Sequence, residues 1–148
     1  MKKLLNILFL LIVFTIDSNA QTDSVFCATI TNETENISIS INLYDQNIIV
    51  EGQEMLGEMA GYISADYDFR LWLIVSAEIT SEDKAVLTII NDYGSEDLKA
   101  QLTFNNSNST YTLKQLQGST IKFAKNKKWI KLPKELQFKR VDKLTSLQ

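Results

Sequence analysis

The stretch ISISINL, residues 37–43, alternates apolar and polar side chains with a period of two. Its isoleucines and its leucine fall on one face of an extended chain, and its serines and asparagine fall on the other. This alternation is typical of a half-buried β-strand, because successive side chains of a strand point to opposite faces. A helix would instead repeat its apolar positions about every 3.6 residues. The stretch therefore points to a β-sheet.

Similar segments recur along the chain about every eight to twelve residues, with turn residues between them, as in a meandering antiparallel sheet. They are residues 47–52, 69–80, 85–91, 98–104, 110–116 and 119–124. We expect 47–52 to form a tight hairpin with 37–43, and 69–80 to be a central strand with Trp72 in the core. The run LWLIV within it suggests burial on both faces. Three glycines in residues 52–61 argue against a helix there, so we expect one short turn or none.

The predicted fold is all-β, an antiparallel meander of about 8–10 short strands with little helix. Two architectures protect the sheet edges: a small up-and-down barrel and a two-sheet sandwich. The sequential hairpins favour the barrel, which resembles lipocalin-like architecture in outline. The N-terminal glycine-x-tryptophan signature of lipocalins is absent, so no family is assigned. Pro133 is expected at an edge strand or between two short strands.

The first twenty residues have a different character from the rest. Lys2 and Lys3 precede an apolar run at residues 4–14, and Ser18-Asn19-Ala20 places small residues where a signal peptidase cleaves. Spanning a bilayer takes about 20 apolar residues, which this run does not reach. We predict a secretory signal peptide at residues 1–20, a single β domain at 21–148, export to the periplasm or extracellular space, and no membrane span.

Composition excludes several kinds of chemistry. The chain has no histidine and one cysteine, Cys27, so Ser-His-Asp and Cys-His pairs and the usual zinc sites cannot be built. The five glycines form no phosphate-binding pattern. Cys27, in the apolar context SVFCATI, is expected to be a buried small hydrophobe. We expect a protein that is not an enzyme and uses no cofactor or metal.

Carboxylates are the remaining candidates for catalysis. Asp66 and Asp68 lie in SADYDF, and three more lie in NDYGSED, residues 91–97. Acid–base catalysis needs two carboxylates in different environments across a cleft. Turns favour Asp, Asn and Gly for backbone reasons, so we interpret these residues as solvated turn residues.

Charge is distributed unevenly. Residues 122–143 hold nine Lys or Arg and two Asp or Glu, whereas residues 21–121 hold four and fifteen. Nucleic-acid-binding domains are usually basic overall, so we expect no nucleic-acid partner. Within 122–143 cations alternate with apolar residues. We therefore interpret these cations as the outer face of half-buried strands that lie beside acidic strands, rather than as a recognition surface.

If this segment does bind a partner, the candidate ligand- or partner-binding residues are Lys127, Lys128, Trp129 and Lys131. Trp129 is expected to seal the end of the barrel; the alternatives are that it stacks on a ligand or receives a lysine over its ring.

The functional expectation is an exported, monomeric, non-enzymatic module that binds or inhibits an unknown protein or cell-envelope polymer. The alternatives are a carrier with a small apolar ligand inside a barrel calyx and a carboxylate-dependent hydrolase. A gap in the barrel core would favour the carrier, and two carboxylates converging in a cleft would favour the hydrolase.

Overall fold

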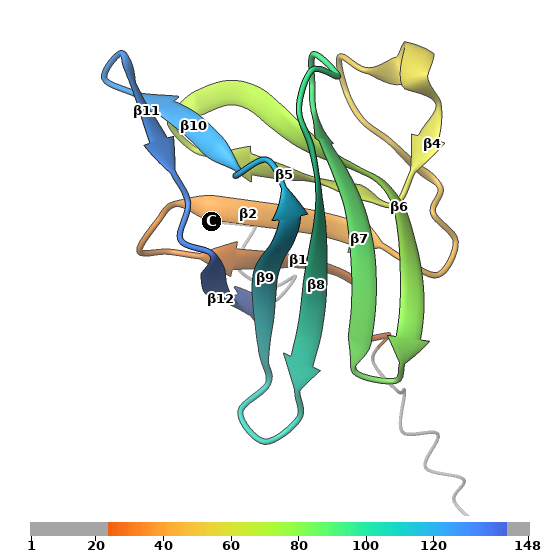
Figure 1. Ribbon diagram of the computed structural model, residues 1–148. Helices are drawn as coiled ribbons and strands as arrows, with labels where there is room; N and C mark the ends of the chain where they lie inside the picture. Colours follow the sequence, from red (N-terminus) through yellow and green to blue (C-terminus); the bar gives the residue numbers. More distant parts are fainter. Residues whose placement is uncertain (1–23, 142–148) are drawn as a thin grey trace, which may run out of the picture.

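A computed structural model describes residues 24–141, and eight of its strands form a closed antiparallel barrel (Figure 1). Around the barrel the order is β1, β12, β9, β8, β7, β6, β5, β2. These strands are β1 (Cys27–Asn32), β2 (Ile37–Asn42), β5 (Gly61–Ala65), β6 (Asp68–Ser81), β7 (Lys84–Asn91), β8 (Asp97–Asn105), β9 (Thr110–Gly118) and β12 (Glu135–Arg140). The predicted all-β meander is confirmed, and it closes as a barrel. The predicted signal peptide at 1–20 lies outside the described residues.

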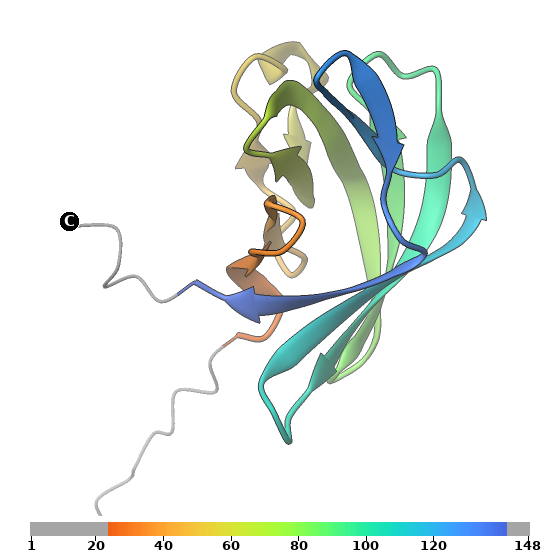
Figure 2. The same cartoon turned by 90° about the vertical axis from the view of Figure 1, so that its left-hand side faces the viewer.

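Two short ribbons interrupt the meander and project from the same end of the barrel (Figures 1 and 2). One joins β3 (Ile48–Ile49) to β4 (Glu58–Met59) through the single-turn 3-10 helix η1 (Glu54–Leu56), and the other joins β10 (Lys122–Lys125) to β11 (Lys128–Lys131). The expectation of at most one short helical turn at 52–61 is therefore confirmed. Within residues 24–141, no helix has the length and apolar character needed to cross a membrane.

The expected hairpin between 37–43 and 47–52 is wrong. Strand β2 pairs with β1 and β5, whereas the only partner of β3 within residues 24–141 is β4. Gly61 permits this arrangement, because a Cβ at that position would clash with the backbone carbonyl of Ser40 on β2. Strand β5 therefore pairs with the edge of β2 to which residues 47–52 were expected to pair.

The barrel interior is filled by a continuous cluster of apolar side chains. On β2 the alternation is followed closely, with Ile37, Ile39 and Ile41 buried and their polar neighbours partly exposed. Aromatic residues from other parts of the chain join them, including Phe26 before β1, Tyr111 on β9 and Phe138 on β12. An eight-stranded barrel encloses a space about wide enough for side chains to fill, and here large aliphatic and aromatic groups occupy it.

The middle of strand β6, residues 72–74, is buried on both faces, as LWLIV suggests. Trp72 is 3% exposed and belongs to the interior cluster, whereas Leu73 is fully buried in a second cluster with Val50 and Met59. Because successive side chains point to opposite faces, Leu73 lies outside the barrel. The ribbon of β3 and β4 is what covers it.

The barrel closes at a seam between its first and last strands. Strands β1 and β12 share two register pairs, Ile30 with Arg140 and Thr31 with Lys139. Beyond them, the Asn32 side chain donates to the Gln137 carbonyl (2.7 Å). Pro133 lies between β11 and β12, where a break between short strands was expected.

The expectation that Cys27 is buried is wrong, because its side chain is exposed. Phe26 and Ile30 of this segment are buried, so the alternation places Cys27 on the outer face. A mostly apolar context such as SVFCATI gives no clear indication of which face a given residue occupies.

Candidate functional site

The candidate site lies on and beneath the basic hairpin, which we define as residues 122–131, comprising β10, β11 and the turn between them. Its cross-strand pairs place lysine opposite lysine twice, Lys122 with Lys131 and Lys125 with Lys128. The expectation that acidic strands lie beside these cations is therefore wrong within the hairpin, since β10 and β11 pair with each other. Like charges directly opposite each other destabilise a ribbon.

The turn of the basic hairpin adds a further cation in an unfavourable conformation. Asn126 and Lys127 both have positive φ, 52° and 64°, as the two central residues of a type I′ hairpin turn require. Glycine is the usual residue at the second of these positions, and a non-glycine residue there is uncommon. A lysine occupies it here, and it is exposed.

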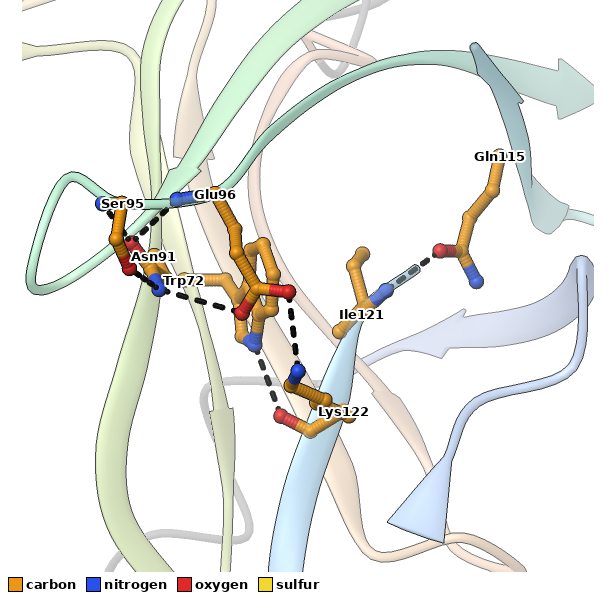
Figure 3. Close-up of polar contacts among 7 residues, drawn as sticks. All are labelled: Trp72, Asn91, Ser95, Glu96, Gln115, Ile121 and Lys122. Atoms are coloured by element: carbon orange, nitrogen blue, oxygen red, sulfur yellow. Dashed lines mark hydrogen bonds and ion pairs between the residues drawn. The ribbon is translucent and has the colours of Figure 1, made fainter. Parts of the chain in front are cut away.

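The root of the basic hairpin is fixed by buried hydrogen bonds. Gln115 on β9, 8% exposed, accepts from the Ile121 amide (2.8 Å; Figure 3). It also donates to the Pro133 carbonyl (3.0 Å), so it contacts the segments that precede and follow the hairpin. Trp72 Nε1 donates to the Lys122 carbonyl (3.0 Å). Phe123 is fully buried in the interior cluster. The hairpin is thus preorganised although all four residues of β11 are exposed.

Asp68 also anchors β10, and the interpretation of this carboxylate as a solvated turn residue is wrong. Its side chain is 2% exposed, pairs with Arg70 Nη1 (3.1 Å) and accepts from the Ala124 amide (2.6 Å). A buried carboxylate is tolerated where a cation and backbone donors satisfy it. Asp68 therefore has a structural role, and it fixes Arg70 beside the hairpin.

A pocket of about 300 Å³, which we name the rim pocket, lies between the basic hairpin, the start of β6 and the β7–β8 turn. It is lined by Arg70, Leu71, Trp72, Asn91, Asp92, Tyr93, Ser95, Glu96, Lys122 and Trp129. Two cations, two carboxylates and three aromatic rings thus meet in one small space.

Asn91 shapes the β7–β8 turn that forms one wall of the rim pocket. Its Oδ1 accepts from the amides of Ser95 (2.9 Å) and Glu96 (3.2 Å), and its Nδ2 donates to Ser95 Oγ (2.9 Å; Figure 3). Glu96 in turn pairs with Lys122 Nζ at 3.0 Å, joining this turn to β10. The ion pair between Glu96 and Lys122 therefore holds the β7–β8 turn next to the basic hairpin.

Trp129 lies at the opening of the rim pocket, so the expectation that it seals the barrel end is wrong. It is 57% exposed, with the Arg70 guanidinium 5.0 Å and the Lys122 ammonium 5.5 Å from its ring centroid. These are cation–π distances, so the alternative of a lysine over the ring is confirmed. Register pairing explains the exposure: Trp129 lies opposite Ala124, on the hairpin face away from Phe123.

The other face of the basic hairpin contacts Tyr67. Lys125 Nζ lies 5.1 Å from the centre of this ring, which packs edge-on against Phe123. Burial raises the pKa of Tyr67 above its usual value, and the charges of Glu35 and Asp68 raise it further. The phenol therefore stays neutral at physiological pH.

The four residues predicted from the sequence do not play equal parts. Trp129 lines the rim pocket, whereas Lys127, Lys128 and Lys131 are exposed on the hairpin. Arg70, Tyr93 and Lys122 also line the rim pocket and were not predicted from the sequence. The sequence does contain a signal for Lys122. Asn126-Lys127 lies between two alternating segments, as a two-residue hairpin turn does, and such a turn sets the register that places Lys122 opposite Lys131.

A second pocket, of about 310 Å³, lies at the seam between the β1–β2 turn and β12. Its lining is Thr31, Asn32, Glu33, Thr34, Thr110, Gln137, Phe138 and Lys139. Phe138 is buried, so this pocket offers a ligand no exposed ring among its lining residues. It holds none of the predicted site residues.

No protein-family model matches the chain, and no curated protein or solved structure matches it either. Function is therefore inferred from the basic hairpin and the rim pocket themselves.

Proposed function

We propose that the protein is an exported, non-enzymatic binding module, and that its basic hairpin binds the anionic groups of a protein or cell-envelope polymer. The observation that carries this proposal is that lysine faces lysine in two of the four cross-strand pairs between β10 and β11. Each such pair costs stability, in the range of about 0.2–1 kcal/mol for cross-strand pairs.

The fold itself leaves most of this charge unneutralised. Among the described residues, Lys122 has an ion-pair partner in Glu96, while Lys127, Lys128 and Lys131 have none. A ribbon selected for stability alone would place Glu or Thr opposite lysine and Gly in the turn. Strain and repulsion gathered at one exposed feature support a role in recognition, with the partner supplying the negative charge.

The two alternatives have weaker support. A carrier needs room inside the barrel, where a continuous apolar cluster is packed. A hydrolase needs an available pair of carboxylates. Asp92 and Glu96 do line one pocket, but Glu96 accepts from Lys122 and Asn91, and Asp92 accepts from the Leu71 amide (3.3 Å). Both carboxylates are therefore already engaged in hydrogen bonds within the protein.

The test is retention on a heparin column under a salt gradient. The Lys127/Lys128/Lys131→Ala triple variant should lose most of the retention of the native chain, because exposed charges act over about 10 Å at 0.1 M salt. The matched control is Lys84/Lys99/Lys114→Ala, which removes the same charge from exposed positions on the barrel wall.

Thermal unfolding of both triple variants establishes that they are folded. Equal elution of the two variants, or native retention insensitive to salt, would contradict the proposal. Cleavage of an added polymer during the same incubations would favour the hydrolase.

A further inference from the structure

We infer that the rim pocket is a monosaccharide subsite, so that the partner is an acidic polysaccharide whose sugar ring lies against Trp129 while its carboxylate or sulfate groups meet the hairpin lysines. This inference rests on the proposed function and names the chemical class of its ligand.

Exposed aromatic rings are the first observation. Trp129 and Tyr93 line the pocket at 57% and 74% exposure, and Phe69 beside Arg70 is 82% exposed. The face of an aromatic ring is negative, and the axial C–H groups of a pyranose are weakly positive, so the two stack. Arg70 and Lys122 hold Trp129 in place before any ligand arrives, which lowers the entropic cost of binding.

Unused hydrogen-bonding capacity around these rings is the second observation. Arg70 uses Nη1 on Asp68, and its other guanidinium N–H groups have no protein acceptor among the described residues. Asp92 accepts one bond through Oδ2, which leaves Oδ1. Ser95 Oγ accepts from Asn91 and keeps its own hydrogen to donate. Donors and acceptors mixed around an aromatic face suit a ring bearing several hydroxyls.

Size and position are the third observation. A volume of about 300 Å³ is at the lower end of the range for small-molecule sites, which suits a single sugar unit of a longer chain. The exposed rings leave the pocket open, so a chain can enter and leave it. Strand alternation places Lys131 on the hairpin face that carries Trp129, where it meets an anionic group of the bound or adjacent sugar.

The experiment compares ligands by isothermal titration calorimetry. The probes are tetrasaccharides bearing carboxylate (a uronic acid series) or sulfate, their neutral counterparts, inorganic polyphosphate as a polyanion without sugar, and single-stranded DNA. We expect at least one acidic tetrasaccharide to bind more tightly than its neutral counterpart. Trp129→Ala and Tyr93→Ala should each weaken that binding about tenfold or more, with polyphosphate binding unchanged. Tyr44→Ala, an exposed aromatic outside both pockets, is the matched control.

The outcomes separate the subsite from the basic hairpin. Equal binding of polyphosphate and acidic sugars, unaffected by Trp129→Ala, would overturn the subsite and leave the proposed function standing. Sugar binding lost in Trp129→Ala but unchanged in the Lys127/Lys128/Lys131→Ala variant would support the subsite and contradict the proposed function. Binding that is tightest to single-stranded DNA and depends on Trp129 would overturn the sugar subsite and indicate that a nucleobase stacks on Trp129 instead. No binding to any probe would overturn both.

Discussion

The basic hairpin (122–131) and the ribbon of residues 48–59, which we name the acidic ribbon, leave the same end of the barrel but are attached in different ways. The acidic ribbon lies on the outer wall, where Val50 and Met59 cover Leu73. The basic hairpin inserts Phe123 into the interior cluster and is held by Trp72. Two adjacent residues of β6 thus hold one ribbon each.

The charged side chains of the two ribbons also differ in what they contact. In the acidic ribbon, Glu54 accepts from the Gly52 amide (2.8 Å), and this bond holds the pKa of Glu54 below its ordinary value. That negative charge supports the turn that carries it. In the basic hairpin the lysines oppose each other across the ribbon. The difference teaches that the charge of Glu54 stabilises the turn that carries it, whereas the lysine charges of the basic hairpin repel one another across the ribbon.

The largest expected loss of stability comes from removing the side chain that holds each ribbon, Trp72 for the basic hairpin and Leu73 for the acidic ribbon. Trp72→Ala and Leu73→Ala should each lower the free energy of unfolding by about 2–5 kcal/mol, the range for large-to-small changes in a packed core. Urea unfolding measures this loss. Native-state hydrogen exchange should show faster exchange in residues 122–131 for Trp72→Ala, and near residues 48–59 for Leu73→Ala.

Phe69→Ala provides the control. Phe69 lies on the same strand, three residues before Trp72, and is 82% exposed, so its replacement should leave the exchange of both ribbons close to native. If each core variant loosened both ribbons equally, the two attachments would be one cooperative unit and the comparison would fail.

An intermediate effect is expected at the root of the basic hairpin. Gln115→Leu leaves the Ile121 amide and the Pro133 carbonyl without their side-chain partner, which should cost about 1–3 kcal/mol of unfolding free energy. Gln117→Leu changes the same residue type at an exposed position of the same strand, so its cost should be within about 0.5 kcal/mol. A cost at Gln115 no larger than at Gln117 would show that the root is not held in this way.

The smallest effect has the opposite sign. Lys128→Glu places opposite charges across the ribbon from Lys125, which should stabilise the protein by about 0.2–1 kcal/mol while weakening retention on heparin. Lys139→Glu is the control, because Lys139 pairs with Thr110 and Thr31 and gains no such partner. Destabilisation by Lys128→Glu would mean that the lysine pairs do not strain the hairpin.

The barrel could be predicted because its signal is local. In β2 and β7 every second residue is buried, and such alternation can be read directly from the sequence. The pairing of β3 with β4 could not, because two-residue strands carry no period. Nothing near residue 48 indicates that its partner is Met59. The burial of Leu73 depends on that pairing and was visible only as an unusually apolar run.

The candidate site could be predicted only in part, because it is assembled from three separate parts of the chain. The cations of 122–131 are evident in the sequence, but their pairing depends on the turn at Asn126-Lys127. Arg70 and Tyr93 join Trp129 only when β6 and the β7–β8 turn reach the same end of the barrel. Asp68 resembles a turn residue by sequence, and its burial arises from β10 lying over it.

The seam has a consequence for the order of folding. It joins Asn32 to Gln137, residues 105 positions apart, and contacts this distant in sequence carry a high loop-closure entropy and slow the folding of a β-protein. Since β1 is made before β12, the ring cannot close until β12 has been synthesised. During that interval β1 presents an unpaired edge, so the nascent chain is most vulnerable to aggregation, and most accessible to a chaperone, at its own first strand.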